Sequence, residues 1–319
     1  MTPSQLTRRD FLERATCAAV IAGIATRGVP ASAAPGMFIS LNSATSGNVP
    51  WPEFARLAAR VGYGGVDWGL GPAKAAGLDV TRALFAELNI KPTIVNLPLQ
   101  GPFAGDDATF RPKLTQLAGD AAFTAGIGCQ RMLMVLSPTG PSPKDEYRKI
   151  VRDRLAAIAE VLLRSNIRLG MEFLGVQSFR MGRAGGPPPN PFIWTLAETV
   201  ELAKDSGPNI GVILDAWHWH HAGSTIADIL AAGRSRIVHV HVSDAKQQPP
   251  GEVTDRGRLM PGEGIIDLVA FFQALQKIGY VDGVSPEPLG RIPAGMPPED
   301  AAKLGLETTT AVMKKAGVI

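Results

Sequence analysis

Cysteine and net charge are both scarce in this sequence, and each shortage excludes a class of protein. Only Cys17 and Cys129 are cysteines. Cys17 lies in a leading segment that we expect to be removed, so the processed chain cannot form an intramolecular disulfide. The chain carries 32 basic and 29 acidic side chains; its first 34 residues hold four arginines and two acids, which leaves 28 against 27. A chain this close to neutral has no general attraction for a polyanion, and we expect no nucleic-acid partner.

The leading segment also lacks an apolar run long enough to cross a bilayer, which takes about 18 to 20 residues. Its apolar run covers only residues 15–26, between a polar start and the small residues 31–33, as in an export signal. Arg8 and Arg9, followed by Phe11 and Leu12, resemble a twin-arginine signal. We predict a cleaved twin-arginine signal over residues 1–34, a single domain over residues 35–319 and a periplasmic or otherwise exported location, with no membrane segment in the mature form. An uncleaved amphipathic anchor is the alternative.

From residue 37 onward, short apolar segments typical of strands alternate with longer segments of helical periodicity. The short segments lack a polar face, as expected of parallel strands buried on both sides. They cover residues 37–42, 65–68, 92–97, 131–136, 168–173, 211–215, 237–243 and 283–287. The helical segments cover residues 52–60, 81–88, 113–125, 145–165, 191–205, 225–232, 268–278 and 301–315. Eight such units predict an α/β fold, a single closed (β/α)8 TIM barrel, which typically needs about 250 residues.

An open, doubly wound sheet is the alternative architecture. It would require a glycine-rich phosphate loop after the first strand, and residues 42–47 read Asn-Ser-Ala-Thr-Ser-Gly instead. Two long loops, at residues 174–190 and 245–264, follow the fifth and seventh strands. In a barrel both would lie on the catalytic face.

Four consecutive strands end in side chains that bind metals. These are Glu172, Asp215, His241 and Glu287, which we call the ligand group. In a (β/α)8 barrel, the carboxyl ends of the strands surround one mouth, where the active site is built. Three carboxylates buried together there are costly unless a cation compensates their charge. The ligand group therefore predicts a divalent metal ion, although any one of these residues alone would more often be a helix cap or an ion-pair partner.

Three oxygen donors with one imidazole favour Mn²⁺ first, with Mg²⁺, Co²⁺ or Zn²⁺ as alternatives. His239 shares a strand face with His241, one layer deeper, and we expect it to be a packed histidine or to support a ligand from behind. Asn42, Trp68 and Asn96 close the first three strands, which predicts that they line the mouth and contact the substrate.

Such a site has a definite chemistry. A hydroxy-ketone chelated through its carbonyl and neighbouring hydroxyl has an acidic α-hydrogen, because the cation stabilises the enediolate. One carboxylate can remove that proton, and a second can return it to the opposite face, an epimerisation, or to the neighbouring carbon, an isomerisation. Loss of a leaving group from the same enediolate would instead make the enzyme a lyase or dehydratase.

Taken together, several segments resemble the xylose isomerase-like barrel superfamily. Its sugar phosphate isomerase/epimerase group, with tagatose epimerases, hydroxypyruvate isomerases and inosose dehydratases, is the most similar. The resemblance runs from about residue 37 to the end and is carried by Glu172-Phe173-Leu174-Gly175, Leu214-Asp215-Ala216-Trp217-His218, His239-Val240-His241-Val242-Ser243-Asp244, Arg258-Leu259-Met260-Pro261-Gly262-Glu263-Gly264 and Glu287-Pro288.

The resemblance implies that Glu172 and Glu287 bind the metal and also shuttle protons, as the catalytic residues. It implies that His218 and Arg258 contact substrate oxygens. The loop before Arg258 is longer here than in the epimerases, so the neighbouring Arg256 is an alternative for that role.

We therefore predict a divalent-metal-dependent isomerase or epimerase of a ketose or keto-sugar. Because phosphorylated sugars are scarce outside the cytoplasm, we expect an exported enzyme to act on free sugars, oxidised keto-sugars or glycosides. The alternatives are a keto-glycoside lyase or hydrolase, a dehydratase, and a non-catalytic periplasmic sugar-binding protein. We do not expect endonuclease IV activity, because that class of enzyme holds three metals with many histidines, some from early strands, and no histidine precedes His218 here. The partners expected are a small carbohydrate and the twin-arginine export machinery, and a homo-oligomer is compatible with a barrel of this group.

Overall fold

A computed structural model describes residues 36–181 and 189–319 of the chain. The predicted export signal at residues 1–34 lies outside this described part. Within it, every helix is too short or too polar to cross a bilayer.

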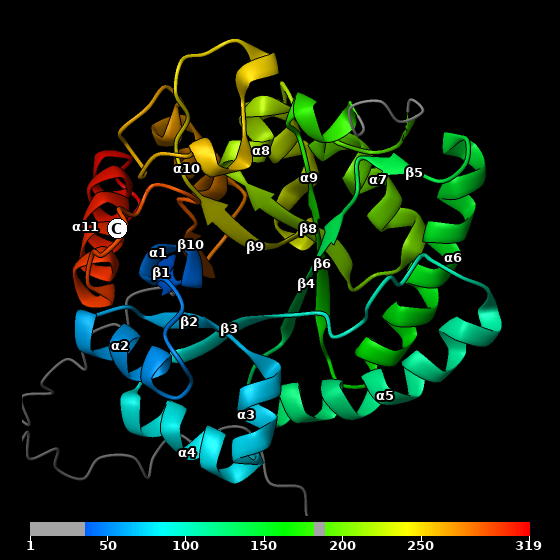
Figure 1. Ribbon diagram of the computed structural model, residues 1–319, viewed down its shortest axis with the longest axis horizontal. Coiled ribbons are helices and arrows are strands. Elements are labelled where there is room, and N and C mark those ends of the chain that lie inside the picture. Colours follow the sequence, from blue (N-terminus) through cyan, green and yellow to red (C-terminus); the bar gives the residue numbers. More distant parts are fainter. Residues whose placement is uncertain (1–35, 182–188) are drawn as a thin grey trace, which may run out of the picture. The chain divides into compact units, whose positions relative to one another are not determined.

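Eight parallel strands close into a barrel at the centre of the molecule (Figure 1). They are β1 (Phe38–Leu41), β2 (Gly65–Trp68), β3 (Lys91–Asn96), β4 (Arg131–Leu136), β6 (Arg168–Phe173), β8 (Ile210–Asp215), β9 (Ile237–Val242) and β10 (Gly283–Pro286). Around the barrel they follow the order β1-β10-β9-β8-β6-β4-β3-β2. All eight predicted strands are confirmed, each within one residue at either end, and the open sheet is excluded.

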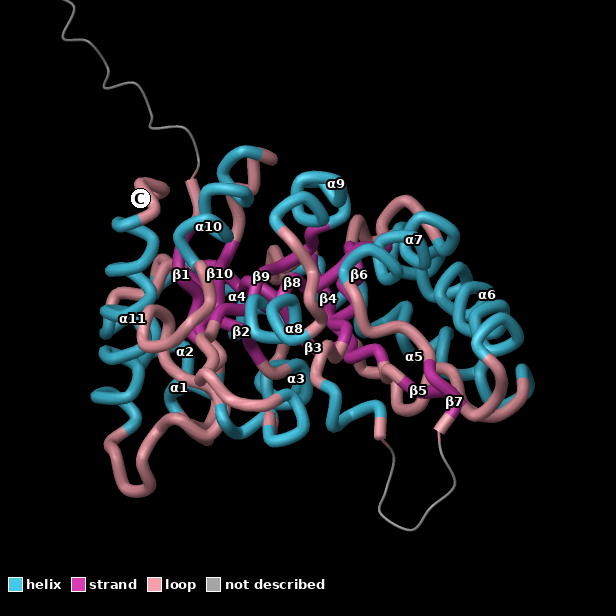
Figure 2. The backbone as a smooth tube through the Cα atoms, turned by 90° about the horizontal axis from the view of Figure 1, so that it is seen from above, coloured by secondary structure: helices cyan, strands magenta, loops and turns pink. Residues whose placement is uncertain are grey.

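Helices surround the strands, with α11 and α6 on opposite sides of the barrel (Figure 2). Eight of the helices match predicted segments: α2 (Glu53–Val61), α4 (Leu78–Leu88), α5 (Asp107–Gly126), α6 (Lys144–Leu163), α7 (Leu196–Ser206), α9 (Ile226–Arg236), α10 (Leu268–Lys277) and α11 (Pro298–Lys315). Short elements at the strand ends were not predicted. They are α1 (Ser43–Ser46), α3 (Leu70–Ala76), α8 (Ala216–His221), and the 3-10 helices at Gln177–Arg180, Pro250–Glu252 and Asp255–Gly257.

A two-stranded antiparallel sheet joins β5 (Thr139–Gly140) to β7 (Asn190–Pro191). The sequence predicted a helix from residue 191, but the helix begins only after Thr195, whose hydroxyl accepts a hydrogen bond from the Glu198 amide. The residues before that cap pair with the loop after β4 instead.

The interior of the barrel is filled below the mouth. Ile94, Ile213 and Val238 form a separate buried apolar cluster, with Leu133 packed against it. These residues come from β3, β8, β9 and β4, which are not all neighbours in the barrel, so their side chains meet inside it. This cluster forms an apolar floor, and the polar side chains described next lie among the strands that surround it.

Candidate functional site

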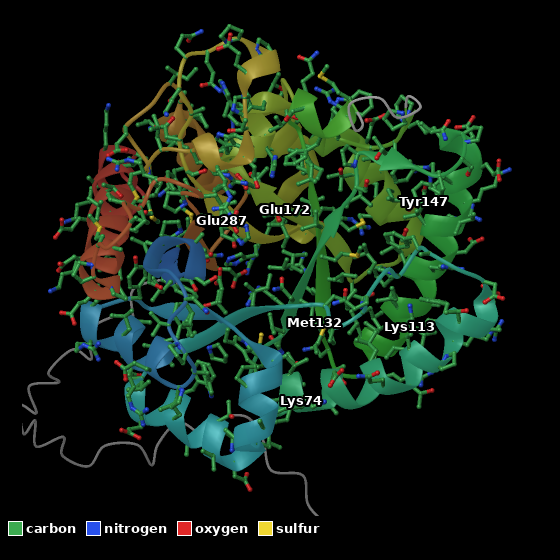
Figure 3. The ribbon with its side chains drawn as sticks, viewed as in Figure 1. Lys74, Lys113, Met132, Tyr147, Glu172 and Glu287 are labelled. Atoms are coloured by element: carbon green, nitrogen blue, oxygen red, sulfur yellow. The ribbon has the colours of Figure 1, made fainter. Side chains whose placement is uncertain are left out.

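The structure brings the predicted ligand group together. One ligand atom from each of Glu172, Asp215, His241 and Glu287 lies within 4.8 Å of the others. Glu172 and His241 are each one residue before the end of their strands, β6 and β9. Asp215 is the last residue of β8, and Glu287 directly follows β10. Neighbouring strands hold them level, since Asp215 pairs with His241 in the sheet and His241 pairs with Ser285. Figure 3 shows Glu172 and Glu287 near the centre of the barrel.

His241 faces two carboxylates of the group. Its Nδ1 lies 2.9 Å from Oε1 of Glu172 and 3.5 Å from Oε2 of Glu287. Burial lowers the pKa of His241, but the charges of Glu287 and Glu172 outweigh this and raise it well above its usual value. Conversely, burial raises the pKa of Glu287, but His241 and Arg258 bring it below its usual value on balance. His241 and Glu287 therefore favour each other's charged form.

Asp215 is fixed from both sides. One carboxylate oxygen accepts hydrogen bonds from the backbone amides of Trp217 and His218, and this caps the start of α8. The other accepts from Nη1 of Arg258 at 2.7 Å, and both side chains are almost fully buried. Burial raises the pKa of Asp215, but Arg258 and His218 reverse the effect and hold it well below its usual range. Asp215 therefore stays ionised and correctly oriented at the mouth.

Arg258 is also held firmly. Its Nη1 donates to Oε2 of Glu287 at 3.1 Å, and its Nη2 donates to Asp255 at 2.7 Å. Its guanidinium lies 4.6 Å from the ring centroid of Trp217. Arg256, the alternative for this role, is exposed. Arg258, and not Arg256, is thus the arginine that reaches the ligand group.

The donor set fits a divalent cation. Three carboxylates and one imidazole nitrogen converge in a mostly buried space, and one guanidinium offsets only part of their charge. Carboxylate oxygens with a single imidazole are donors suited to Mn²⁺ and similar ions, with zinc also accommodated. The residues that would hold the ion are the four of the ligand group.

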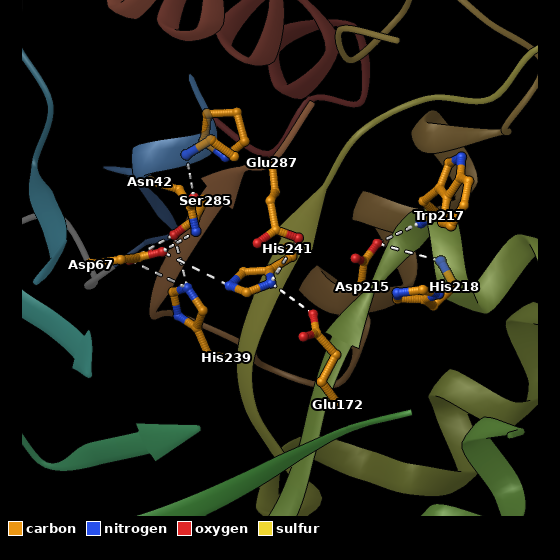
Figure 4. A network of polar contacts seen from close by, with 12 residues as sticks. Asn42, Asp67, Glu172, Asp215, Trp217, His218, His239, His241, Ser285 and Glu287 are labelled. Atoms are coloured by element: carbon orange, nitrogen blue, oxygen red, sulfur yellow. Dashed lines mark hydrogen bonds and ion pairs between the residues drawn. The ribbon is translucent and has the colours of Figure 1, made fainter. Parts of the chain in front are cut away.

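Sequence reasoning missed one residue of this site, Asp67 in β2. Its carboxylate lies on the far side of the His241 ring from Glu172 (Figure 4), with Oδ2 3.8 Å from Nε2 of His241. Burial raises the pKa of Asp67 to about 6, although His241 and neighbouring hydrogen-bond donors act against this. The signal was an acid one residue before the strand end, although alternation alone does not tell which of Asp67 and Trp68 faces the barrel interior.

A cavity of about 380 Å³ adjoins the ligand group. Its walls include Asn42, Trp68 and Asn96, the three predicted substrate-contact residues, together with Glu172, His241 and Glu287. His218 is not among the lining residues; it is buried, and its Nε2 lies 3.3 Å from Nη2 of Arg258. Substrate contact by Asn42, Trp68, Asn96 and His218 stays a prediction. Of these four, Asn42, Trp68 and Asn96 line the cavity, where a substrate can reach them.

The family model described as "Xylose isomerase-like TIM barrel" matches residues 55–312. The chain belongs to this family. The match covers β2 to β10 and includes the whole ligand group, so the resemblance drawn from the sequence motifs is confirmed at the level of the family.

Curated relatives of this family member include inosose isomerases. That of Bacillus velezensis is 29% identical over 173 residues, which cover 54% of this chain and 58% of the relative. That of Halalkalibacterium halodurans is 27% identical over 240 residues, covering 75% of this chain and 80% of the relative. The match thus spans little more than half the length of the Bacillus protein.

Solved structures show the same barrel. A xylose isomerase domain protein from Alicyclobacillus acidocaldarius has a TM-score of 0.79 and 26% identity, covering 88% of this chain and all of that one. The IolI protein with a bound zinc atom has a TM-score of 0.72 and 24% identity, covering 88% of this chain and 99% of that one. An L-ribulose 3-epimerase superposes with a TM-score of 0.68 at 20% identity, covering 88% and 96%. At 24% and 20% identity, the last two structures show only that the fold is shared.

Proposed function

We propose that this protein is a divalent-metal-dependent isomerase or epimerase of a ketose or keto-sugar. The observation that carries the proposal is the ligand group, which converges beside a cavity that is large enough for a small ligand. The inosose isomerases among its relatives and the epimerases among its structural neighbours support the same class of reaction.

The cation held by the ligand group would polarise the substrate carbonyl and so acidify the hydrogen on the adjacent carbon. Glu172 and Glu287 act as the two proton-transfer groups. They come from β6 and from the end of β10, which are separated in the barrel by β8 and β9. A substrate between them therefore presents different sides to the two carboxylates, and one can take a proton that the other returns.

Arg258 and His241 keep Glu287 ionised. Nη1 of Arg258 and Nδ1 of His241 both lie close to Oε2 of Glu287, at 3.1 Å and 3.5 Å. Their positive charge favours the carboxylate form, which a proton acceptor needs. Glu172 contacts Nδ1 of His241 at 2.9 Å but, among the described residues, is not paired with Arg258, so the two glutamates differ in their surroundings and can take different roles.

The substrate we propose is uncharged. No lysine or arginine is among the described residues that line the cavity. Its walls combine the acids of the site with apolar side chains, including Trp51, Phe54 and Val135. A phosphate group would find no lysine or arginine side chain among these residues, which supports a free sugar or keto-sugar and agrees with the proposed export of the chain.

Mn²⁺ is the ion that we propose first, on the oxygen-rich donor set; zinc is the ion held by the related IolI structure. We also propose the periplasmic or otherwise exported location and the use of the twin-arginine machinery on the motif at Arg8 and Arg9. Elimination from a keto-glycoside by the same proton abstraction is the alternative outcome.

The test is exchange of the α-hydrogen. Metal-loaded protein is incubated with candidate ketoses and keto-sugars in D₂O, and deuterium incorporation is followed by NMR. Exchange should occur in the wild type and be lost in Glu172→Gln and Glu287→Gln. Glu160→Gln, on the exposed face of α6, is the matched control and should exchange normally. Absence of exchange with every ketose would reject catalysis and favour a sugar-binding protein.

A further inference from the structure

His241 has a second ring nitrogen that the ligand group does not use. Nε2 is buried and has no hydrogen-bond partner among the described residues. The nearest acidic atom to it is Oδ2 of Asp67, at 3.8 Å, which is longer than a hydrogen bond. An unpaired donor or acceptor at this depth is costly, so this nitrogen requires a partner in the working protein.

Asp67 is held in place to be that partner. Its Oδ1 accepts hydrogen bonds from the hydroxyls of Ser40 and Ser285, each at 2.9 Å. Its Oδ2 accepts from Nδ2 of Asn42 at 3.1 Å. Three neutral donors from β1, β10 and the turn after β1 thus fix the carboxylate, and Oδ2 keeps a free lone pair on the side of His241.

We propose that Asp67 is a positioning residue for the metal site. It accepts the Nε2 proton of His241, which fixes the tautomer that leaves Nδ1 unprotonated toward Glu172, Glu287 and the cation. A histidine that binds a metal usually donates its other ring N–H to such an acceptor, and this orients the ring and strengthens the ligand. The inference rests on the proposed function, since it assumes that the ligand group binds a metal.

A second metal ion between Asp67, His239 and His241 is the competing interpretation, because their ligand atoms also lie close together. Two contacts oppose it. Nε2 of His239 is already paired with the Ser285 hydroxyl at 2.8 Å, and the Asp67 oxygens already accept three hydrogen bonds. Nδ1 of His239 and Nε2 of His241 still have no hydrogen-bond partner among the described residues, so the stoichiometry of zinc binding decides between one ion and two.

The experiment is a zinc titration of the full-length protein after chelation, by calorimetry, with the stoichiometry measured as well as the affinity. Asp67→Asn keeps the size of the side chain but removes its charge and replaces one acceptor oxygen by an NH2 donor. We expect it to weaken zinc binding by about 10- to 100-fold while one zinc still binds per chain. Asp145→Asn, the same substitution at an exposed residue in the first turn of α6, is the matched control, and its zinc affinity should stay close to that of the wild type.

A second measurement needs no variant of Asp67. In zinc-loaded, nitrogen-15-labelled wild type, His241 should show a protected Nε2–H signal, which is assigned by its loss in His241→Gln. An unprotonated Nε2, equal zinc affinity of Asp67→Asn and wild type, or two zinc ions per wild-type chain would each overturn the proposal for Asp67. Wild type that binds no zinc or Mn²⁺ at all would instead reject the proposed function, and the role of Asp67 with it.

Discussion

Nη1 of Arg258 lies 2.7 Å from Oδ2 of Asp215, and this buried contact links the loop after β9 to the end of β8. The same nitrogen lies 3.1 Å from Oε2 of Glu287. One guanidinium thus compensates two carboxylates of the ligand group and holds them in fixed orientations. Among the described residues, the third carboxylate, Glu172, is paired with His241 alone, so the ligand group keeps an excess of negative charge that a divalent cation would offset.

Removing the guanidinium should destabilise the fold. Arg258→Met leaves Asp215 and Glu287 without their shared partner, and breaking a buried ion pair in this way costs about 3–5 kcal/mol. We expect the free energy of unfolding in urea to fall by that amount in chelated protein, and Mn²⁺ to restore part of it by supplying positive charge.

Arg291→Met is the control for this change. Arg291 pairs with Glu263 on the surface, where both side chains are 32% exposed, and such a pair contributes about 0–1 kcal/mol. If the two variants lose equal stability, the compensation at Asp215 is not what Arg258 provides.

The stability of chelated protein should depend on the protonation of His241. The pKa of this residue is raised well above its usual value: Glu287 and Glu172 outweigh the burial that lowers it. When folding raises the pKa of a group, the protonated form of that group stabilises the folded state. This contribution is complete below the unfolded pKa, about 6.5 for histidine, and is lost as the pH rises through the folded pKa. We expect the free energy of unfolding to decrease as the pH rises above about 6.5, with a shallower slope in His241→Gln. Parallel profiles for the two proteins would contradict this account of the site.

Phosphorylated substrates should be poor ones. The described residues that line the cavity include no lysine or arginine, and Glu172 and Glu287 would repel a nearby phosphate. We expect a higher KM for a ketose phosphate than for the same ketose without its phosphate, measured in one assay with the same metal. A preference for the phosphorylated sugar would show that a cation outside this lining reaches the substrate.

The sequence predicted the barrel and the ligand group well, for a physical reason. Strands buried on both faces are continuous apolar segments, and parallel strands bring their carboxyl ends to one mouth, so the sequence alone places Glu172 and Asp215 together. Asp67 was missed because the prediction selected Trp68, the last residue of the same strand. Which of two adjacent side chains faces the barrel interior depends on the register between strands, which the sequence does not display.

Short elements were missed for a related reason. α1 and α8 have four and six residues, and each starts at a capping side chain, Asn42 or Asp215. Segments so short have no helical periodicity to read. The exact place of Arg258 was also beyond the sequence, because it depends on long-range contacts with Asp215 and Glu287.

The most direct test of the central claim is the rate of α-hydrogen exchange in D₂O after exhaustive chelation and after Mn²⁺ is returned, with a ketose that the untreated protein accepts. If the ligand group binds the ion that activates the substrate, exchange should disappear on chelation and return with the ion in wild type, but not in Asp215→Asn. Exchange at the full rate in chelated protein would contradict the account.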